Sequence, residues 1–289
     1  MSYENNYYMT LPSNVKSNVR KNKTSHFLTE LPKAIEIERE NWEAALVEID
    51  YPHSWYNVKP RECRFSIFKA STSDRDQVIK QVIVLTPGYY NSAQEIIRDI
   101  LEKKNNLFSS HVLFDSISRK VRIYIANGEG IHLTRPLANL LGFLRPVREF
   151  HENYFEITKY RNIEFTEVDD NNVPFANESL ETENDFTKII ADRAFDIYNG
   201  LNSIYVYTNI IEDCIVGNAS VPLLRNVLVS GSYGDIVQQT FIQPHYLRIS
   251  QNRIKDIEII LRDDKGDLIP FEHGKVIVKL HFRRKPVLV

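Results

Sequence analysis

Histidine, cysteine and acidic side chains carry most catalysis and metal binding in proteins, and in this chain they are not spaced to act together. The eight histidines show no H-x-H or H-x-x-x-H spacing, which would bring two imidazoles to one face of a strand or helix. Cys63 and Cys214 each lie beside an apolar, β-prone run, which favours buried structural thiols over nucleophiles. The sequence therefore predicts no catalytic residue, no metal site and no cofactor.

Phosphate-binding and nucleophile motifs are absent from the sequence. The closest approach is Gly128-Glu129-Gly130, but no third glycine follows and no helix signal begins there, so a turn between strands is predicted. The sequence contains neither G-x-x-x-x-G-K-S/T nor G-x-S-x-G. An enzyme is consequently the least favoured functional class.

Aromatic side chains cluster around Pro52 and allow two interpretations. They are Trp42, Tyr51, Trp55 and Tyr56. Such a cluster can stack against a sugar, but packing in a core needs no ligand and is the favoured interpretation.

The basic residues near the N-terminus are the strongest candidates for binding. Lys16, Arg20, Lys21 and Lys23 occur in an Asn- and Ser-rich segment with a single acid, Glu4. This composition predicts a flexible basic N-terminal arm over residues 1–26, which could contact nucleic acid or neighbouring subunits. A plain polar tail explains the composition equally well.

Residues 164–185 have the opposite charge. This stretch contains eight acidic residues and no lysine or arginine. Because like charges repel, we expect an extended, solvated loop.

Strand patterns dominate the first and last thirds of the chain. Residues 275–283 alternate apolar and polar side chains, and with residues 257–261 they predict a hairpin with a longer loop. Residues 42–49 fit either a strand or a short helix, and the nearby Pro52 favours the strand. Further strands are expected at 64–68, 204–208, 226–229 and 238–242.

The middle of the chain carries helix signals. Ser92 and Glu95 form a capping-box pattern ahead of an amphipathic stretch, which predicts a helix over 92–104. A strand pair is expected at 112–114 and 121–125. Thr134 as the cap, Pro136 in the first turn and Gly142 at the end predict a second, short helix.

These elements predict a mainly β fold, a single jelly roll (β-sandwich) with a small inserted α+β domain. Neither strand-rich block can close a sandwich alone, so residues 27–75 and 195–289 are expected to fold together. Residues 76–194 then form the inserted domain, with a compact α+β unit at 76–150 and the acidic loop at 164–185.

Composition limits the environment and the partners. Two cysteines in 289 residues favour a reducing compartment, no apolar run approaches the roughly 18 residues of a membrane span, and the N-terminus has no secretory signal pattern. We therefore expect a soluble chain made inside a cell, without a membrane partner. A net charge of −2 excludes a histone-like positive coat but allows local basic patches.

Several stretches resemble one known family. Residues 31–58 (LPKAIEIERENWEAALVEIDYPHSWYNV), 205–225 (YVYTNIIEDCIVGNASVPLLR) and 257–285 (IEIILRDDKGDLIPFEHGKVIVKLHFRRK) resemble the penton (minor capsid) proteins of Maverick/Polinton-type elements and of virophages such as Mavirus. The stretches YYNSAQEIIRDI, LFDSISRKVRIYI and LTRPLANLLGF are similar to the insert of those proteins.

The resemblance implies a structural role in a virion. It implies a single jelly roll that forms a homopentamer at the vertices of an icosahedral double-stranded DNA virus or virophage capsid, made in the host cell. It also implies a double jelly-roll major capsid protein as neighbour, and packaged DNA is a further expected partner of the arm. The alternative is a receptor- or glycan-binding β-sandwich of a viral spike or fibre.

Overall fold

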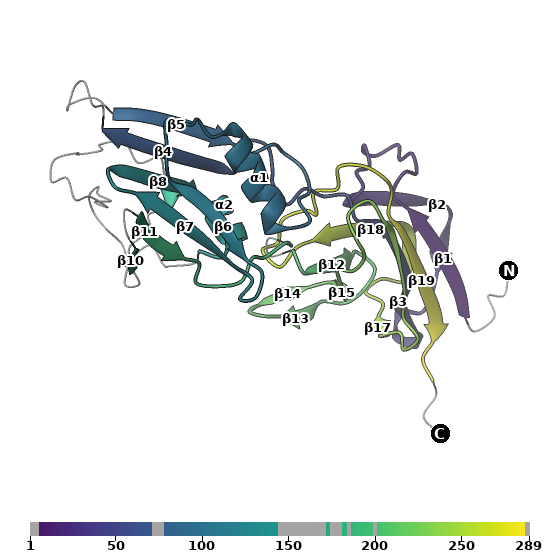
Figure 1. Cartoon of the computed structure of the whole chain (residues 1–289). Coiled ribbons are helices and arrows are strands. Elements are labelled where there is room, and N and C mark those ends of the chain that lie inside the picture. The colour runs from purple at the N-terminus through teal and green to yellow at the C-terminus, as the bar shows by residue number, and fades with distance from the viewer. Residues whose placement is uncertain are drawn as a thin grey trace. The chain divides into compact units, whose positions relative to one another are not determined.

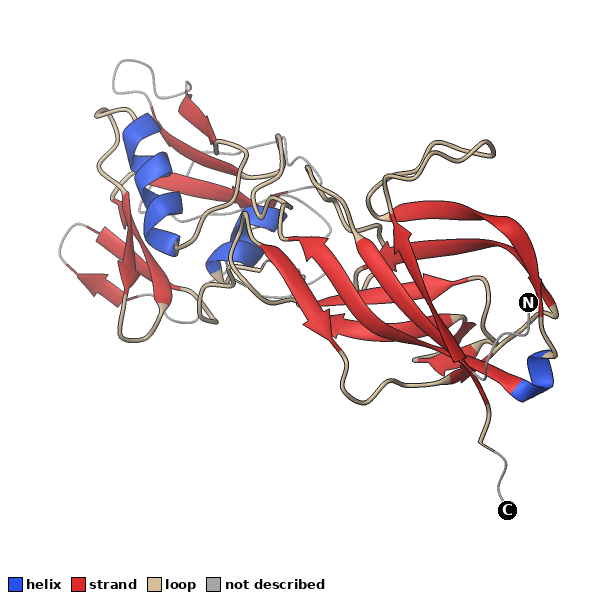
Figure 2. Cartoon of the chain, turned by 90° about the vertical axis from the view of Figure 1, so that its right-hand side faces the viewer, coloured by secondary structure: helices blue, strands red, loops and turns tan. Residues whose placement is uncertain are grey.

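The chain folds into two compact units. The computed structural model describes residues 6–70, 78–143, 172–173, 181–183, 186–198 and 201–286. One unit comprises Met1–Trp55 and Leu201–Val289, and the other comprises Tyr56–Gly200. The sequence of the second unit therefore interrupts that of the first, and strands predominate in both (Figure 1, Figure 2).

Two antiparallel sheets form the first unit. The first sheet has the order β1 (Asn6–Pro12), β19 (Ile277–Arg284), β3 (Trp42–Pro52) and β16 (Ile236–Thr240), and β17 (Leu247–Arg248) also pairs with β3. The second sheet has the order β15 (Leu223–Leu228), β12 (Ser203–Thr208), β18 (Arg253–Arg262) and β2 (His26–Glu36).

The strand order identifies the first unit as a jelly roll. If its eight long strands are numbered along the chain, the first sheet reads 1-8-3-6 and the second reads 2-7-4-5. This order arises when a long hairpin that pairs strand 1 with 8, 2 with 7, 3 with 6 and 4 with 5 is rolled into two facing sheets. The expected single jelly roll is confirmed, and we call this part the jelly-roll unit.

The inward faces of the two sheets supply the core of this unit. Ile257, Ile259 and Leu261 of β18 are fully buried, as are Leu280 and Phe282 of β19. Side chains alternate between the two faces of a strand, so every second residue of these strands enters the space between the sheets.

An irregularity in β3 explains why its sequence pattern is ambiguous. The register between β3 and β19 shifts at Val47, because Lys279 pairs with Glu48 whereas Leu280 pairs with Leu46. Such a bulge moves the buried positions by one residue. The positions of β3 that enter the core between the sheets therefore change phase along the strand; they are Trp42, Ala44, Leu46, Ile49 and Tyr51.

Two sequence predictions about the jelly-roll unit are wrong. Strands β18 and β19 do not form a hairpin, because β18 pairs with β2 and β12 while β19 pairs with β1 and β3 of the other sheet. Residues 1–26 are not one flexible arm, because Asn6–Pro12 pairs along its whole length with β19. In both cases partners distant in the sequence decide the structure.

The second unit, which we call the inserted unit, contains two further sheets and two helices. One sheet has the order β5 (Val78–Val84), β4 (Arg64–Ala70), β8 (Glu129–Thr134) and β9 (Asn172–Val173). The other has the order β10 (Glu181–Glu183), β11 (Phe186–Ile190), β7 (Lys120–Ala126) and β6 (His111–Asp115). The helices are α1 (Ala93–Lys103) and α2 (Arg135–Leu141).

Local signals place both helices as predicted. The Ser92 hydroxyl accepts a hydrogen bond from the Glu95 amide, and the Glu95 carboxylate accepts one from the amide of Asn91, so the cap satisfies two N–H groups. Helix α2 ends at Gly142, whose φ of 88° favours glycine. Thr134 precedes α2, but its hydroxyl donates to the Glu62 carbonyl instead of capping the helix.

The boundaries between the two units along the sequence differ from the expected ones. Strand β4 was expected in the jelly roll, but it pairs with β5 and β8, and its Phe65 and Ile67 belong to the core of the inserted unit. The inserted unit consequently spans 56–200 instead of 76–194.

The expected acidic loop at 164–185 lies largely outside the described residues. Within it, residues 172–173 and 181–183 are the strands β9 and β10, so the loop prediction is wrong for them. Hydrogen bonding to β8 and β11 outweighs their local charge.

The remaining described elements lie on the jelly-roll unit. A short ribbon pairs β13 (Cys214–Val216) with β14 (Ala219–Val221), and a single 3₁₀ turn, η1 (Arg39–Asn41), precedes β3. No helix in the described part of the chain is long and apolar enough to cross a membrane.

Candidate functional site

The two cysteines, which were predicted to be structural, lie in different units and are not part of a metal-binding cluster among the described residues. Both cysteines are free: Cys63 is buried in the inserted unit, and Cys214 lies on the β13–β14 ribbon. Burial raises the pKa of the Cys63 thiol to about 12, which keeps it protonated at neutral pH. Among the described residues, no group of three or more histidine, cysteine or acidic side chains is placed to hold a metal ion.

Core packing accounts for three of the four aromatic side chains around Pro52, whereas Tyr56 is half-buried and belongs to the inserted unit. Trp42, Tyr51 and Trp55 are all buried in the core of the jelly-roll unit. The rings of Tyr51 and Trp55 stack with a centroid distance of 6.3 Å. Because these faces are covered by protein, they cannot form an open platform for a sugar.

The basic residues lie in the connection between β1 and β2, and this connection has a defined conformation. The side-chain amide of Asn22 donates to the carbonyls of Val15 and Leu28, and its oxygen accepts from the Leu28 amide at 2.8 Å. We call residues 13–25 the basic loop. It is therefore a fixed loop between two strands, contrary to the predicted flexible arm.

Two carboxylates from adjacent strands hold the basic loop. Glu30 of β2 accepts hydrogen bonds from the Ser17 hydroxyl at 2.7 Å and the Asn18 amide at 2.8 Å, which lower its pKa. Glu258 of β18 lies 2.7 Å from both Arg20 and His26. Burial alone would raise the pKa of Glu258, but the bonds from His26 and Arg20 outweigh it and lower the pKa.

The other three predicted side chains remain available for a partner. Lys16, Lys21 and Lys23 are exposed, and no acidic side chain of the described residues forms an ion pair with them. Lys275 belongs to the same surface, because the flanking Gly274 accepts a hydrogen bond from Thr24 at 3.2 Å. The structure thus separates Arg20, which is neutralised by Glu258, from three lysines that are not.

The position of the basic loop follows from the register of the first sheet. Pro12, where β1 ends, pairs with Ile277, and Ile277 pairs with Asp50 near the end of β3. The basic loop therefore leaves the sheet at the same end at which the chain leaves for the inserted unit. At the opposite end, Asn6 pairs with Arg283, so the first residue of β1 and the last residues of β19 lie there.

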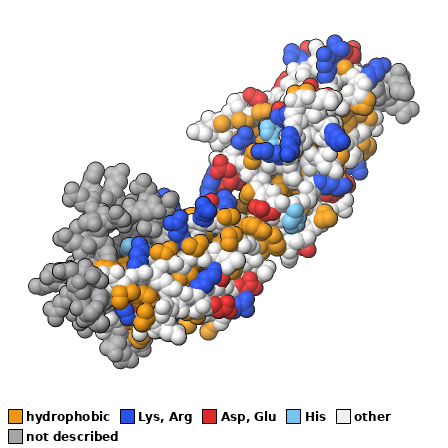
Figure 3. All heavy atoms as spheres, turned by 90° about the horizontal axis from the view of Figure 1, so that it is seen from above, with side chains coloured by type: hydrophobic (Ala, Val, Ile, Leu, Met, Phe, Trp, Pro, Cys, Tyr) orange, Lys and Arg blue, Asp and Glu red, His pale blue; other side chains and the backbone are white. Residues whose placement is uncertain are grey.

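Charge is mixed over the visible part of the face shown in Figure 3. In the space-filling view of Figure 3, basic, acidic and hydrophobic side chains are interspersed, with lysine and arginine in small groups. This agrees with the net charge of −2.

A further network, which the sequence did not suggest, covers the outer face of the first sheet. The His281 ring stacks on Tyr8 at 4.3 Å and shares a hydrogen bond of 2.7 Å with the Tyr246 hydroxyl. The Arg283 guanidinium lies 3.3 Å from the centre of the Tyr246 ring and donates to Glu43. Burial, with the charge of Arg283, lowers the pKa of His281. Tyr8 reaches His281 through the pairing of β1 with β19, and Glu43 reaches Arg283 through the pairing of β3 with β19. These strands are far apart in the sequence, so no local pattern could have revealed the network.

Comparison with known proteins gives structural likenesses only. No family model matches the sequence, and no curated protein matches it significantly. The chain is similar to the mavirus penton protein, with a TM-score of 0.47 and 12% identity over 96% of this chain and 100% of that chain. It is also similar to a chain of the Sputnik virophage structure, with a TM-score of 0.42 and 13% identity over 98% of each chain. The jelly roll itself is assigned from the strand order of this chain.

Proposed function

We propose that this chain is a structural subunit of an icosahedral viral capsid, a penton protein that forms the vertices as a homopentamer. The observation that carries the proposal is the complete 1-8-3-6 and 2-7-4-5 jelly roll, interrupted at one end by a second compact unit. The resemblance of residues 31–58, 205–225 and 257–285 to penton proteins points to the same role. We further propose a double jelly-roll major capsid protein as the neighbour, and the virion as the location.

The edges of the first sheet support assembly into a ring. A cyclic ring repeats one heterologous interface, so each subunit must present two different patches. The edge strand β1 exposes Tyr8 by 60%, and the opposite edge strand β16 exposes Ile236 by 80%. These apolar side chains on two different edges are suited to contact each other between successive subunits.

The basic loop is suited to a contact with a neighbouring subunit or with DNA, depending on which end of the jelly roll faces the capsid interior. The basic loop leaves the sheet at the end at which the chain leaves for the inserted unit, so a subunit with that end directed outward would direct Lys16, Lys21 and Lys23 away from the packaged DNA. We propose the outward orientation, and hence a contact between the basic loop and a neighbouring capsid subunit.

A density map of assembled particles tests the proposal. We expect the chain at the five-fold vertices, with the jelly roll in the shell. Density at hexagonal positions would contradict the penton role, and density only on a protruding fibre would favour the receptor- or glycan-binding alternative. Light scattering provides a preliminary test, because a stable pentamer has five times the 33.8 kDa mass of the chain.

A further inference from the structure

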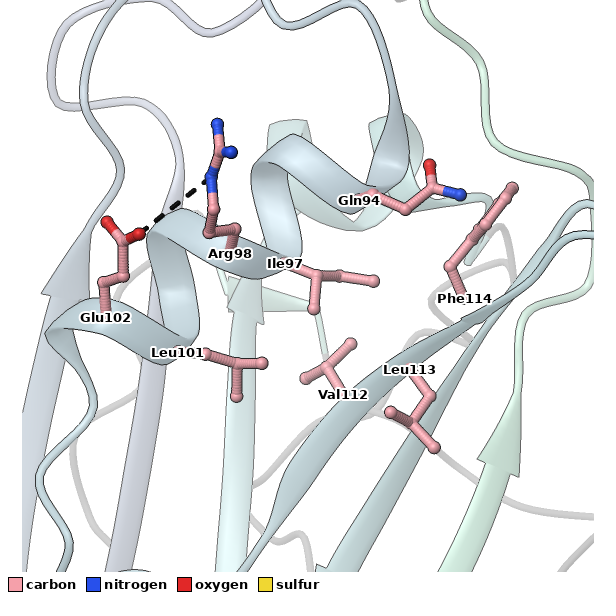
Figure 4. A pocket seen from close by; sticks show the side chains of 8 residues that line it. All are labelled: Gln94, Ile97, Arg98, Leu101, Glu102, Val112, Leu113 and Phe114. Atoms are coloured by element: carbon pink, nitrogen blue, oxygen red, sulfur yellow. Dashed lines mark ion pairs between the residues drawn. The ribbon is translucent and has the colours of Figure 1, made fainter.

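A groove with mainly apolar walls runs along one side of the inserted unit, between α1 and β6. Its volume is about 490 Å³. That is within the range of roughly 300–1,000 Å³ that is typical of binding pockets. Figure 4 shows Ile97 and Leu101 of the helix pointing toward Val112 of the strand, with Leu113 and Phe114 continuing the wall.

The groove is open to solvent at its hydrophobic walls. Leu101 and Leu113 remain 39% and 48% exposed, although both line it. Three polar side chains, Gln94, Arg98 and Glu102, form the rim on successive turns of α1. The rim ion pair is long, at 4.0 Å, and well exposed, so it offers little competition to a ligand.

Strand β6 is at the edge of its sheet, so one side of its backbone has no neighbouring strand among the described residues. The hydrogen bonds between β7 and its other neighbour, β11, show which backbone groups of β6 face β7. The amide of Ala191, which follows β11, donates to the carbonyl of Val121 at 2.9 Å, so the N–H and C=O groups of Val121 point toward β11. Because alternate residues of a strand bond to opposite neighbours, Arg122 and Tyr124 bond to β6.

This alternation identifies the backbone groups of β6 that have no strand partner among the described residues. The partners of Arg122 and Tyr124 are Leu113 and His111, which use their N–H and C=O groups toward β7. Val112 and Phe114 therefore direct theirs to the open edge, and both also line the groove. Two donors and two acceptors of an unpaired strand thus lie directly beside an apolar groove.

The opposite wall of the groove is held in place. Asp99 on α1 accepts hydrogen bonds from the Thr86 amide at 2.9 Å and from Lys103 at 2.9 Å. Lys103 also donates to the carbonyl of Val84 on β5, at 2.9 Å. A ligand would consequently meet a preformed site and lose little free energy in ordering it.

We propose that the groove binds an extended peptide segment of another protein, which adds a strand to the free edge of β6. The unpaired N–H and C=O groups fix the ligand as an extended chain. Its side chains alternate, so apolar residues at every second position enter the groove between α1 and β6. The site lies within the inserted unit, and only the choice of a peptide over a second copy of the chain rests on the proposed function.

A second copy of this chain is the competing occupant. Pairing of β6 with β6 of another copy would create a two-fold axis, which is an isologous contact. A five-fold ring contains no two-fold axis, so such a contact would have to link separate rings. The peptide is therefore the occupant that we favour, and oligomeric state separates the two.

Selection from a phage-displayed library of random nine-residue peptides on the full-length protein tests the proposal. We expect enriched peptides with apolar residues at alternate positions, and about ten-fold or greater weakening of their binding by Leu113→Lys. Ile117→Lys is the matched control, because Ile117 is 94% exposed on the turn that follows β6 but does not line the groove. No enrichment, or equal binding to both variants, would overturn the proposal.

N-methylation of single amides in the best peptide tests strand addition itself. Methyl groups on alternate amides should weaken binding about ten-fold or more, whereas those on the intervening amides should have little effect. Equal tolerance at all positions would contradict strand addition. A dimer of the wild-type protein that Leu113→Lys dissociates would also overturn the proposal, in favour of a second copy. None of these outcomes depends on whether the chain assembles into capsids.

Discussion

At the scale of single residues, the chain uses its charges mainly to fix loops. Glu258 binds both Arg20 and His26, and Glu30 binds the backbone and hydroxyl of the preceding loop. The sequence analysis grouped Arg20 with Lys16, Lys21 and Lys23, but the carboxylates that hold the loop lie on β2 and β18. Residues so far apart in sequence give no local signal of their contact.

Glu258→Gln should loosen the basic loop without unfolding the protein. The substitution removes the charge that attracts Arg20 and His26, and because the pair is partly exposed we expect a loss of less than about 1 kcal/mol in unfolding free energy. Amide hydrogen exchange in residues 13–25 should become faster. Glu36→Gln is the control, since Glu36 pairs with Arg253 on the same two strands but does not contact the loop. Unchanged exchange in the loop would show that Glu258 does not hold it.

His132 should make the inserted unit sensitive to acid. Burial, and then the charge of Lys80, lowers its pKa to about 4, whereas an unfolded histidine titrates near 6.5. Between these pH values the unfolded chain binds a proton that the folded chain does not, so stability falls as the pH is lowered from about 6.5 to about 4. The expected decrease in the free energy of unfolding is on the order of 1–3 kcal/mol.

Urea denaturation at pH 7 and pH 4.5 measures this loss. His132→Asn should reduce the difference between the two pH values, because asparagine does not titrate. His111→Asn serves as the comparison, since it removes another histidine of the inserted unit, on β6. If His132→Asn leaves the pH difference as large as in the wild type, His132 is not the cause.

At the scale of elements, predictions succeeded where the signal was local. The capping pattern at Ser92 predicted α1, and Gly142 helped to predict α2. The alternation of apolar and polar side chains predicted β19. Alternation was also present in β1, where Tyr7, Met9 and Leu11 face the core, but the polar composition of the region hid it. The β18–β19 hairpin prediction was wrong because consecutive strands of a jelly roll can belong to opposite sheets.

Ser92→Ala should destabilise α1 and with it one wall of the groove. The Ser92 hydroxyl accepts from the Glu95 amide, and loss of such a cap typically costs about 1 kcal/mol. Ser116→Ala is the control, because Ser116 is exposed in the turn after β6 and lies outside α1. Urea denaturation measures both variants. An equal effect of the two substitutions would mean that the cap contributes nothing specific.

At the scale of the whole molecule, the jelly roll separates two kinds of surface. The strands of the first sheet carry the basic loop and the start of the insertion at one end, and the start of β1 and the end of β19 at the other. A strand of about ten residues is roughly 33 Å long, which is several times the Debye length of about 8 Å at physiological salt. Charges at one end of the jelly roll therefore do not influence an anion at the other.

This geometry leads to a prediction about assembled particles. If the end of the jelly roll at which the chain leaves for the inserted unit faces outward, the basic loop should face outward too, and the end of β19 should face the interior. Replacing Lys16, Lys21 and Lys23 by glutamine should then leave the amount of packaged DNA and its release by salt unchanged. Replacing Arg284 and Lys285 at the opposite end should make the release occur at lower salt. If the lysine variant alone changes DNA release, the basic loop faces the genome and the proposed orientation of the subunit is reversed.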